Sequence, residues 1–256
     1  ENVCDVGCGV GNLILAYLEL IGEERAYNLI SNGNLYLYDI DDIALEICKY
    51  TIAIKYGKDL LKKINAKHCD FLSKKVKLPT NSKVISNPPY YKILKTGEDW
   101  NLTKVVTDSK ELYSCFIEKI INQSDRSVII TPYSFIGSGK FYSLRQVMNN
   151  YNGFVVSFDN VPGNIFNGRK HGIFNSNKGN SVRAAITVVE NKNDVKGFKF
   201  SPLIRFKTDE RTKMLNNKFL EGLVNNRYQL VDSKNKSFYK CHNELIEVLD
   251  QWEKES

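Results

Sequence analysis

The sequence predicts an α/β fold in which helices cover both faces of a mainly parallel β-sheet. Short apolar or β-branched segments alternate with segments of helical periodicity over the first 150 residues. A glycine-rich turn follows the first of these segments, as it does where a parallel strand leads into a helix. Two later strand-like segments, 154–158 and 181–189, have no helical pattern between them, which indicates an antiparallel pair. We therefore expect a doubly wound sheet of seven strands that ends in an antiparallel hairpin.

The individual elements follow from residue type and spacing. Each expected strand is a short apolar or β-branched segment, and each expected helix repeats apolar residues three or four positions apart. We expect parallel strands at 3–5, 35–39, 66–69, 84–86 and 127–131, and helices at 13–21, 43–56, 111–122 and 142–149. A Gly- and Asn-rich insertion at 160–180 separates the two strands of the hairpin.

Composition excludes several classes of protein. The chain has 256 residues, 42% of them hydrophobic, and no apolar segment approaches the roughly 20 residues that a membrane-spanning helix needs. Its six cysteines form no CxxC pair, and His68 and His242 each stand beside a single cysteine. This pattern is typical of reduced thiols rather than of a disulfide framework or a zinc site. We expect no metal, no membrane partner and a cytoplasmic location.

Charge is unevenly distributed along the chain. Residues 1–50 carry a net charge of −7, whereas residues 51–140 carry +8 and residues 141–240 carry +10. The acidic first part is unsuited to a polyanion, but the later parts could neutralise several phosphates. An ordinary lysine-rich surface explains the charge equally well.

The first motif, Asp5-Val6-Gly7-Cys8-Gly9-Val10-Gly11, ends the first strand and begins a helix. Glycines there allow a sharp turn and a close approach of the backbone to a ligand. The dinucleotide-binding pattern GxGxxG would require glycine at position 12, which is Asn12. The pattern DxGxGxG instead resembles the S-adenosylmethionine loop of class I methyltransferases. We assign Asp5, Gly7 and Gly9 to a cofactor site.

Carboxylates end the second and third strands. Asp39, followed by Ile40, stands where nucleotide-binding sheets accept two ribose hydroxyls, and Asp41 or Asp42 is expected to cap the next helix. After the third strand, Asp70 could accept a hydrogen bond from the amino group of the cofactor's adenine. The backbone N–H of Phe71 could reach a nitrogen of the adenine ring.

The most specific motif is Asn87-Pro88-Pro89-Tyr90, directly after the fourth strand. An exocyclic amine conjugated to a ring is a poor nucleophile, because its lone pair is delocalised. The Asn87 side-chain oxygen, which also borders the cofactor, and the Pro88 carbonyl could accept both N–H bonds and direct the lone pair at a methyl donor. Tandem prolines stiffen the loop, and Tyr90 offers a face on which a planar base could stack. We assign these four residues to catalysis.

In this order, the four motifs resemble the gamma class of N6-adenine DNA methyltransferases of restriction–modification systems, over about residues 1–190. The resemblance implies a Rossmann-like class I methyltransferase fold, S-adenosylmethionine as cofactor and duplex DNA with a flipped adenine as substrate. It also implies that Phe166 supplies a second aromatic ring to the flipped base, although a Phe that packs within its loop is an equal alternative. Trp100 could shield an unstacked base, but an ordinary loop anchor is the favoured interpretation.

The resemblance divides the chain into a catalytic domain, residues 1–190, and a basic linker or start of a recognition region, residues 191–256. A target-recognition domain, separate or C-terminal, is then an expected partner. The chain begins directly on a strand pattern, so we expect a fragment of a longer protein and weak cofactor binding. Two alternatives remain open. One is an amino-methyltransferase for RNA or a protein glutamine, and the other is a non-catalytic DNA-binding or assembly module.

Overall fold

The computed structural model describes residues 1–160, 182–191, 197–210, 212 and 228–229. The chain divides into two compact units, one formed by residues 1–130 and 188–194 and the other by residues 131–187 and 195–256. In chain order the elements are β1 (Asn2–Val6), α1 (Asn12–Ile21), α2 (Glu23–Ser31), β2 (Leu35–Asp39), α3 (Asp42–Tyr56), η1 (Lys58–Lys63), β3 (Asn65–His68), β4 (Ser82–Ser86), α4 (Lys104–Ser109), α5 (Leu112–Gln123), β5 (Arg126–Pro132), η2 (Tyr133–Ile136), η3 (Gly139–Phe141), α6 (Tyr142–Met148), β6 (Asn152–Phe158), β7 (Ala184–Glu190), β8 (Gly197–Ile204), η4 (Thr208–Glu210) and β9 (Tyr228–Gln229).

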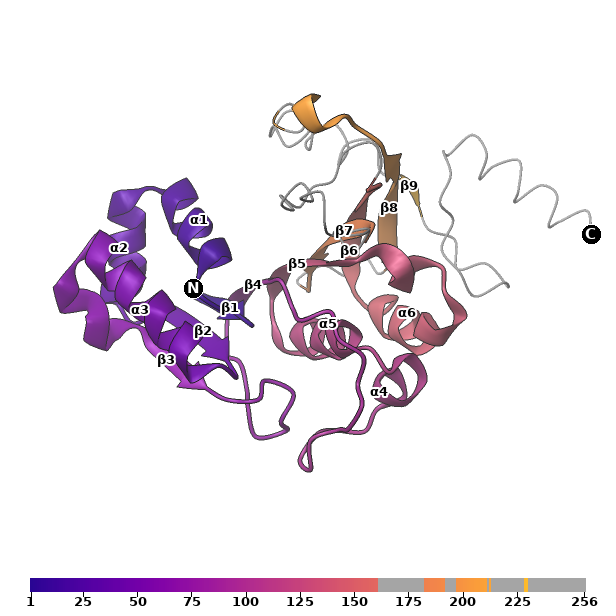
Figure 1. The fold of residues 1–256 in the computed structure, drawn as a ribbon, viewed down its shortest axis with the longest axis horizontal. Helices are drawn as coiled ribbons and strands as arrows, with labels where there is room; N and C mark the ends of the chain where they lie inside the picture. Colours follow the sequence, from indigo (N-terminus) through magenta and orange to yellow (C-terminus); the bar gives the residue numbers. More distant parts are fainter. Residues whose placement is uncertain (161–181, 192–196, 211, 213–227, 230–256) are drawn as a thin grey trace, which may run out of the picture. The chain divides into compact units, whose positions relative to one another are not determined.

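The first unit is built on five parallel strands in the order β3-β2-β1-β4-β5 (Figure 1). All four neighbouring pairs are parallel, with Asp5 of β1 opposite both Leu37 of β2 and Ile85 of β4. Because β1 pairs with β2 on one side and with β4 on the other, the strand order reverses beside β1. Ligands of open α/β sheets bind at the carboxyl ends of the strands at such a reversal.

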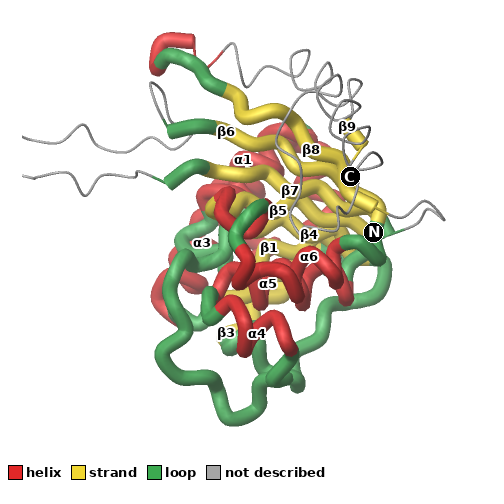
Figure 2. Tube along the Cα trace, turned by 90° about the vertical axis from the view of Figure 1, so that its right-hand side faces the viewer, coloured by secondary structure: helices red, strands yellow, loops and turns green. Residues whose placement is uncertain are grey.

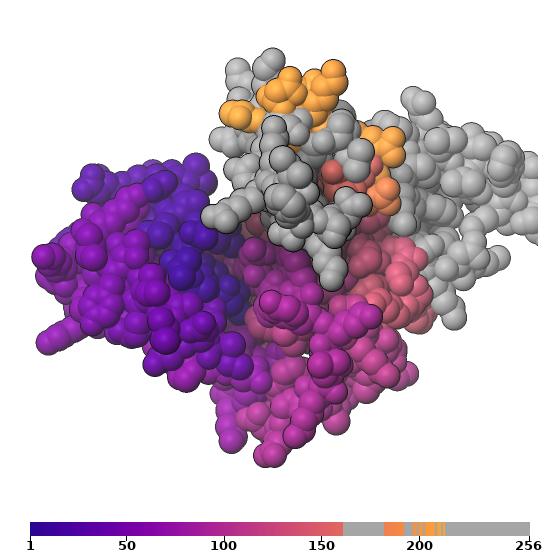
Figure 3. All heavy atoms as spheres, in the orientation of Figure 1, coloured from indigo at the N-terminus to yellow at the C-terminus, as the bar shows by residue number. Residues whose placement is uncertain are grey.

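Alternate residues of β1 and β2 supply the two faces of this sheet. Val3, Leu35 and Leu37 are buried in one core with α1, α2, α3 and η1. Figure 1 shows these three helices together beside β1–β3, and Figure 3 shows their outer surface in indigo and purple. On the alternate position of β2, Tyr38 packs edge-on against Phe71, which in turn contacts Phe116 of α5. Each large apolar side chain buried in this way contributes roughly 1.5–3 kcal/mol.

The second unit contains η2, η3, α6, the first part of β7 (up to Thr187) and the strands β6, β8 and β9, and the strand order is β7-β6-β8-β9 (Figure 2). Strand β8 runs parallel to β6 and antiparallel to β9. The side chain of Asp159, just after β6, is only 4% exposed and forms ion pairs with Arg183 (2.9 Å) and Arg205 (2.7 Å). The two guanidinium groups outweigh the opposite effect of burial and lower the pKa of Asp159.

The expected fold class is confirmed: the structure is α/β, with a mostly parallel sheet and an antiparallel part. The described residues contain nine strands rather than the expected seven, and the antiparallel pair is β8–β9, whereas β6 and β7, the strands of the expected hairpin, are neighbours whose antiparallel pairing stays a prediction. All seven expected strands are present, and the expected helices lie at α1, α3, α5 and α6. Helices α2 and α4 and strands β8 and β9 were not expected. Strand β8 lies in residues 191–256, where the sequence predicted a linker or recognition region; the boundary at residue 190 stays a prediction. Phe166 lies outside the described residues.

The five cysteines in the described part of the chain are unpaired, and no group of three His, Cys, Asp or Glu side chains there is placed to hold a metal. No helix in the described ranges is long and apolar enough to cross a membrane.

Candidate active site

The carboxyl ends of β1, β2, β3 and β4 surround a cavity of about 600 Å³. This volume is within the range of roughly 300–1,000 Å³ that small-molecule sites have. The lining residues come from the loops that follow these strands, from the loop after the Asn-Pro-Pro-Tyr motif and from the start of α5. They are Gly7, Gly9, Tyr38, Asp39, Ile40, Cys69, Asp70, Phe71, Asn87, Pro89, Lys92, Ile93, Leu94, Lys95, Trp100, Leu112 and Phe116.

The glycine loop is fixed to both neighbouring strands. Gly7, Gly9 and Gly11 have φ of 72°, 51° and 92°, in the left-handed region that favours glycine. The N–H of Gly7 donates to the carbonyl of Tyr38 at the end of β2 (2.8 Å). On the other side, the buried hydroxyl of Ser86 donates to the Val6 carbonyl (2.5 Å), which holds the end of β4 against the end of β1. The catalytic motif therefore begins beside the glycine loop.

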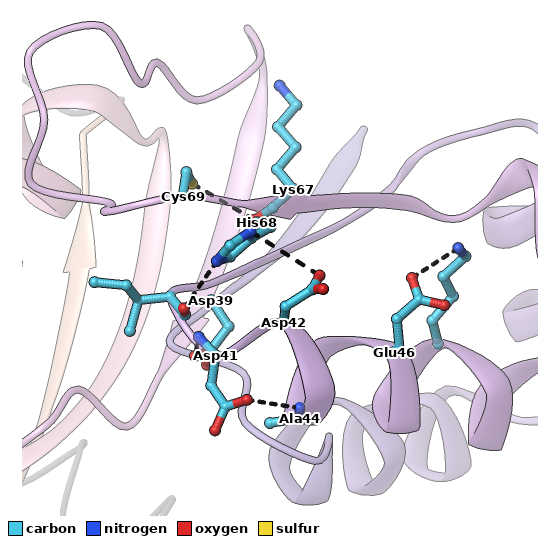
Figure 4. Close-up of polar contacts among 10 residues, drawn as sticks. Asp39, Asp41, Asp42, Ala44, Glu46, Lys67, His68 and Cys69 are labelled. Carbon is cyan, nitrogen blue, oxygen red and sulfur yellow. Dashed lines mark hydrogen bonds and ion pairs between the residues drawn. The ribbon is translucent and has the colours of Figure 1, made fainter.

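Asp39 links the glycine loop to the end of β2. One carboxylate oxygen accepts from the N–H of Gly9 (2.7 Å), and the other accepts from the N–H of Asp41 (2.9 Å). Each oxygen keeps a lone pair, so both could still accept a hydroxyl group. Asp41 is the N-cap of α3 and accepts from Ala44 (3.0 Å), which confirms the expected cap (Figure 4). His68 of β3 bonds to the carbonyl of Ile40 (3.0 Å) at the same strand ends.

The turn after β3 holds Asp70 and Phe71 against the cavity. One Asp70 oxygen accepts from the N–H of Leu72 (2.9 Å), and the other accepts from the indole N–H of Trp100 (2.5 Å). The Lys119 ammonium of α5 donates to the carbonyls of Phe71 and Ser73 and lies 4.8 Å from the Phe71 ring centroid. Burial, with a smaller effect of Lys77, lowers the pKa of Lys119 to about 8.

Asp5 is fully buried near the end of β1. Neither of its oxygens has a hydrogen-bond partner within normal distance and angle, although the N–H of Ile14 is close enough to favour the charged form. Burial outweighs that effect and raises the pKa of Asp5 to about 8. A buried carboxylate without a partner is costly, and a cationic group of a ligand would satisfy it.

In the Asn-Pro-Pro-Tyr loop, Asn87 is exposed, Pro88 is buried, and Pro89 and Tyr90 are half-buried. The Tyr90 hydroxyl lies 2.5 Å from Asn87 Oδ1 and 3.0 Å from the carbonyl of Ile130. Having one proton, it can donate to only one of them at a time. Burial raises the pKa of Tyr90, so the hydroxyl remains a donor. The Tyr90 ring packs edge-on against Tyr113.

The structure brings most of the candidate residues to one cavity. Its lining includes Gly7, Gly9, Asp39, Ile40, Asp70, Phe71, Asn87 and Pro89. Pro88 and Tyr90 are next to lining residues in the chain, whereas Asp5 lies two residues before Gly7 and is fully buried. Their roles remain predictions. Sequence reasoning missed Tyr38, Phe116, Leu112 and the contribution of the 92–95 loop. Trp100 is a loop anchor, the favoured interpretation, because its indole bonds to Asp70.

A parallel sheet with a glycine loop after β1, carboxylates after β2 and β3 and Asn-Pro-Pro-Tyr after β4 defines a site of the class I methyltransferase type. Comparison with known proteins identifies the family. Residues 33–166, just over half of the chain, match the Eco57I restriction-modification methylase family, and the chain belongs to this family. The predicted relationship to restriction–modification methyltransferases is confirmed.

Individual proteins agree with this assignment. The chain is 29% identical over 149 residues to the type II methyltransferase M.VspI of Vibrio sp. (strain 343), a match that covers 56% of this chain and 34% of that protein. The structure of a DrdV–DNA complex superposes with a TM-score of 0.66 at 13% identity, over 92% of this chain and 27% of that one. A putative class I S-adenosylmethionine-dependent methyltransferase from Listeria monocytogenes gives a TM-score of 0.50 at 14% identity, over 88% and 62%. This chain therefore spans about a third of the length of M.VspI.

The family and the fold imply S-adenosylmethionine as the cofactor, and the residues present fit it. The lone pairs of Asp39 suit ribose hydroxyls, and Asp70 and the Phe71 backbone suit an adenine. The carboxyl group of Asp5 has no hydrogen-bond partner, and a cationic amino group beside it would favour its ionised form. A Cβ added at Gly9 would meet nothing within 4 Å, so the backbone there is open to a ligand.

Proposed function

We propose that this chain is the catalytic part of a DNA methyltransferase that transfers the methyl group of S-adenosylmethionine to N6 of an adenine turned out of the duplex. The observation that carries the proposal is the convergence of two sets of residues on one cavity. The glycine loop, Asp39 and Asp70 line it together with Asn87 of the Asn-Pro-Pro-Tyr motif. A methyl donor and an amino group held by these residues would lie side by side.

The residues of β1, β2 and β3 hold the cofactor in this proposal. Asp39 accepts the ribose hydroxyls while it keeps its bonds to the Gly9 and Asp41 N–H groups. Asp70 accepts a hydrogen bond from the amino group of the adenine, and the Phe71 N–H donates to a ring nitrogen. Ile40 covers the adenine from the exposed side of the cavity. Asp5 compensates the positive charge of the methionine amino group. When bound, S-adenosylmethionine supplies a methyl group on a positively charged sulfur.

Asn87 prepares the target amine in this proposal. Its side-chain oxygen now accepts from Tyr90, and it would accept from the amine once the Tyr90 hydroxyl donates to Ile130 instead. A second bond from the amine to the Pro88 carbonyl favours a pyramidal nitrogen with its lone pair localised. Pro88 and Pro89 restrict the loop, so these acceptors are held in place before the amine arrives. Tyr90 stacks on the extruded base.

Three observations favour DNA as the substrate. The chain belongs to a restriction-modification methylase family, and the structure of a DrdV–DNA complex shares its fold. The basic residues after position 50 are suited to phosphate contacts. We propose further that Phe166 adds a second aromatic contact to the base, that sequence recognition requires a further domain, and that the enzyme acts in the cytoplasm.

Cofactor binding by the full-length protein tests the first half of this proposal. Calorimetry should detect S-adenosylmethionine, and Asp39→Ala should weaken binding by about 1–3 kcal/mol, because a charge-assisted contact is lost and ribose hydroxyls are left unpaired. Asp59→Ala, which removes a carboxylate outside the cavity, is the control. Equal affinities for wild type and Asp39→Ala would remove Asp39 from the site.

A further inference from the structure

The loop after the catalytic motif returns to the turn that carries Asp70. Three hydrogen bonds hold its segment Gly97–Trp100 there. The Trp100 indole donates to Asp70. The Ser73 hydroxyl donates to the Asp99 carboxylate (2.5 Å), and the Lys74 N–H donates to the Asp99 carbonyl (2.9 Å). Ser73 and Trp100 also pair as an isolated antiparallel bridge. None of these contacts is required to form the sheet. They join the Asn-Pro-Pro-Tyr loop to the proposed adenine subsite.

Trp100 is built into this position. It lines the 600 Å³ cavity and also a second cavity of about 310 Å³, so it forms a wall between the two. Gly97 leaves room for it: a Cβ at Gly97 would lie 2.5 Å from the indole nitrogen. Any larger residue at position 97 would displace the ring from Asp70.

The hydrogen bond from the Trp100 indole helps to fix the orientation of the Asp70 carboxylate. The Leu72 N–H and the Trp100 indole each occupy one lone pair, one on each oxygen of the carboxylate. An ionised carboxylate has about four acceptor sites, so further donors can still bind, but only in the orientation that these two bonds impose. When the carboxylate is held in one orientation, its free lone pairs point to one place in the cavity. A ligand with an N–H donor at that place is favoured, whereas a ligand with an oxygen there is repelled.

We propose that Trp100 is a positioning residue that makes the adenine subsite selective for the 6-amino group of the cofactor, by orienting Asp70 toward it. This inference rests on the proposed function. It assigns the loop between Tyr90 and α4, which follows the catalytic motif, a role in cofactor recognition. Lys119, which holds the Phe71 and Ser73 carbonyls, supports the same turn from α5.

The test compares two ligands in calorimetric titrations of the full-length protein: S-adenosylhomocysteine and its analogue with a 6-oxo group in place of the 6-amino group. Wild type should prefer the 6-amino ligand by about tenfold or more, the scale of one hydrogen bond to a charged group. Trp100→Phe keeps an aromatic wall but removes the N–H. It should weaken 6-amino binding about fivefold and change 6-oxo binding less than about twofold.

Gly97→Ala provides a second test, because it displaces the indole without removing it. It should reduce the same preference. The matched control, Gly139→Ala, should keep it, since a Cβ at Gly139 meets nothing within 4 Å. An unchanged preference in both test variants, or equal weakening of both ligands, would overturn the inference. Equal binding of the two ligands by wild type would overturn it while leaving the cofactor site intact, and binding of neither would overturn the proposed function as well.

Discussion

At the scale of single residues, the Tyr90 hydroxyl donates a hydrogen bond to Asn87 Oδ1, the oxygen that the proposed mechanism uses to accept from the target amine. Tyr90 donates to Asn87 Oδ1 or to Ile130, and burial keeps it protonated by raising its pKa. The proposed mechanism therefore assigns separate roles to the ring and the hydroxyl. The ring stacks on the base, whereas the hydroxyl only has to leave Asn87.

Substitutions of Tyr90 separate these roles. Tyr90→Phe keeps the ring and frees Asn87 Oδ1, so methyl transfer should stay within about threefold of wild type. Tyr90→Ala removes a stacking partner worth about 1–3 kcal/mol, and a mismatched target that flips more easily should partly restore its activity. Single-turnover rates on matched and mismatched duplexes measure both effects. A Tyr90→Phe rate as low as that of Tyr90→Ala would show that the hydroxyl, not the ring, matters.

Asp5 should make the stability of the cofactor-free protein depend on pH. Its pKa is about 8 in the folded state, against an ordinary 3.8, because the carboxyl is buried. Below pH 4 both states hold the proton. Between pH 4 and pH 8 the unfolded chain releases it and the folded chain retains it, so stability falls as pH rises, by at most about 1.4 kcal/mol per pH unit. Asp5→Asn removes this loss.

Thermal unfolding at pH 5, 6, 7 and 8 measures the effect. The advantage of Asp5→Asn over wild type should grow with each step. The control, Asp59→Asn, changes an exposed side chain whose contact is with the Tyr27 hydroxyl, and it should give a constant difference. An Asp5→Asn advantage that does not change with pH would contradict the proposed burial of a protonated Asp5.

At the scale of elements, the start of α1 depends on close packing at Gly11. Gly11 is the N-cap of α1, with φ of 92°, and an added Cβ would lie 2.5 Å from the Cys48 sulfur of α3. Gly33 also has positive φ, 70°, but a Cβ there would meet nothing within 4 Å. The two glycines therefore separate backbone strain from crowding.

Urea unfolding should distinguish the two positions. Both Gly11→Ala and Gly33→Ala should lose about 1–2 kcal/mol through the left-handed backbone, and Gly11→Ala should lose at least about 1 kcal/mol more through overpacking. Adding Cys48→Ala to Gly11→Ala should recover part of that extra loss. Equal losses at the two glycines would show that α1 and α3 can separate freely.

The sequence predicted most of the elements in which apolar residues recur at regular spacing. The helices α1, α3, α5 and α6 have this spacing, and the bounds of these helices and of the seven expected strands are close to the predicted ones. Strand β8 was missed although Phe198 and Phe200 alternate in it. Helix α2 buries only Ala26 and Ile30, too few apolar positions to show a period, and it begins directly after Gly22, which is a helix-breaking residue. Helix α4 has only six residues and is capped by Thr103.

Local motifs predicted the strand-end residues of the site, because each lies within a few residues of a recognisable strand. The remaining contacts join distant segments. Trp100 reaches Asp70 across 30 residues, and Lys119 reaches Phe71 across 48. The order of side chains along one sequence carries no signal for such pairs, so these contacts could be found only in the structure.

At the scale of the whole molecule, the acidic part of the chain carries the first cofactor-binding motifs, and the basic part carries the proposed catalytic motif. The first 50 residues, with a net charge of −7, carry the glycine loop and Asp39, which suit a cationic cofactor. The excess of basic residues follows position 50, as does the Asn-Pro-Pro-Tyr motif. Binding of DNA should therefore weaken steeply as salt rises, whereas binding of the cofactor should change little.

The identity of the methylated atom tests the central claim most directly. Full-length protein is incubated with methyl-labelled S-adenosylmethionine and unmethylated phage DNA, with RNA and protein as parallel substrates, and the digested products are separated. Label should appear as N6-methyl-2′-deoxyadenosine. Asn87→Ala should reduce it by at least about a hundredfold, the scale of one preorganised transition-state hydrogen bond, while DNA binding survives. The exposed control Asn32→Ala should act as wild type. Label on cytosine N4, on RNA or on protein, or full activity of Asn87→Ala, would contradict the account.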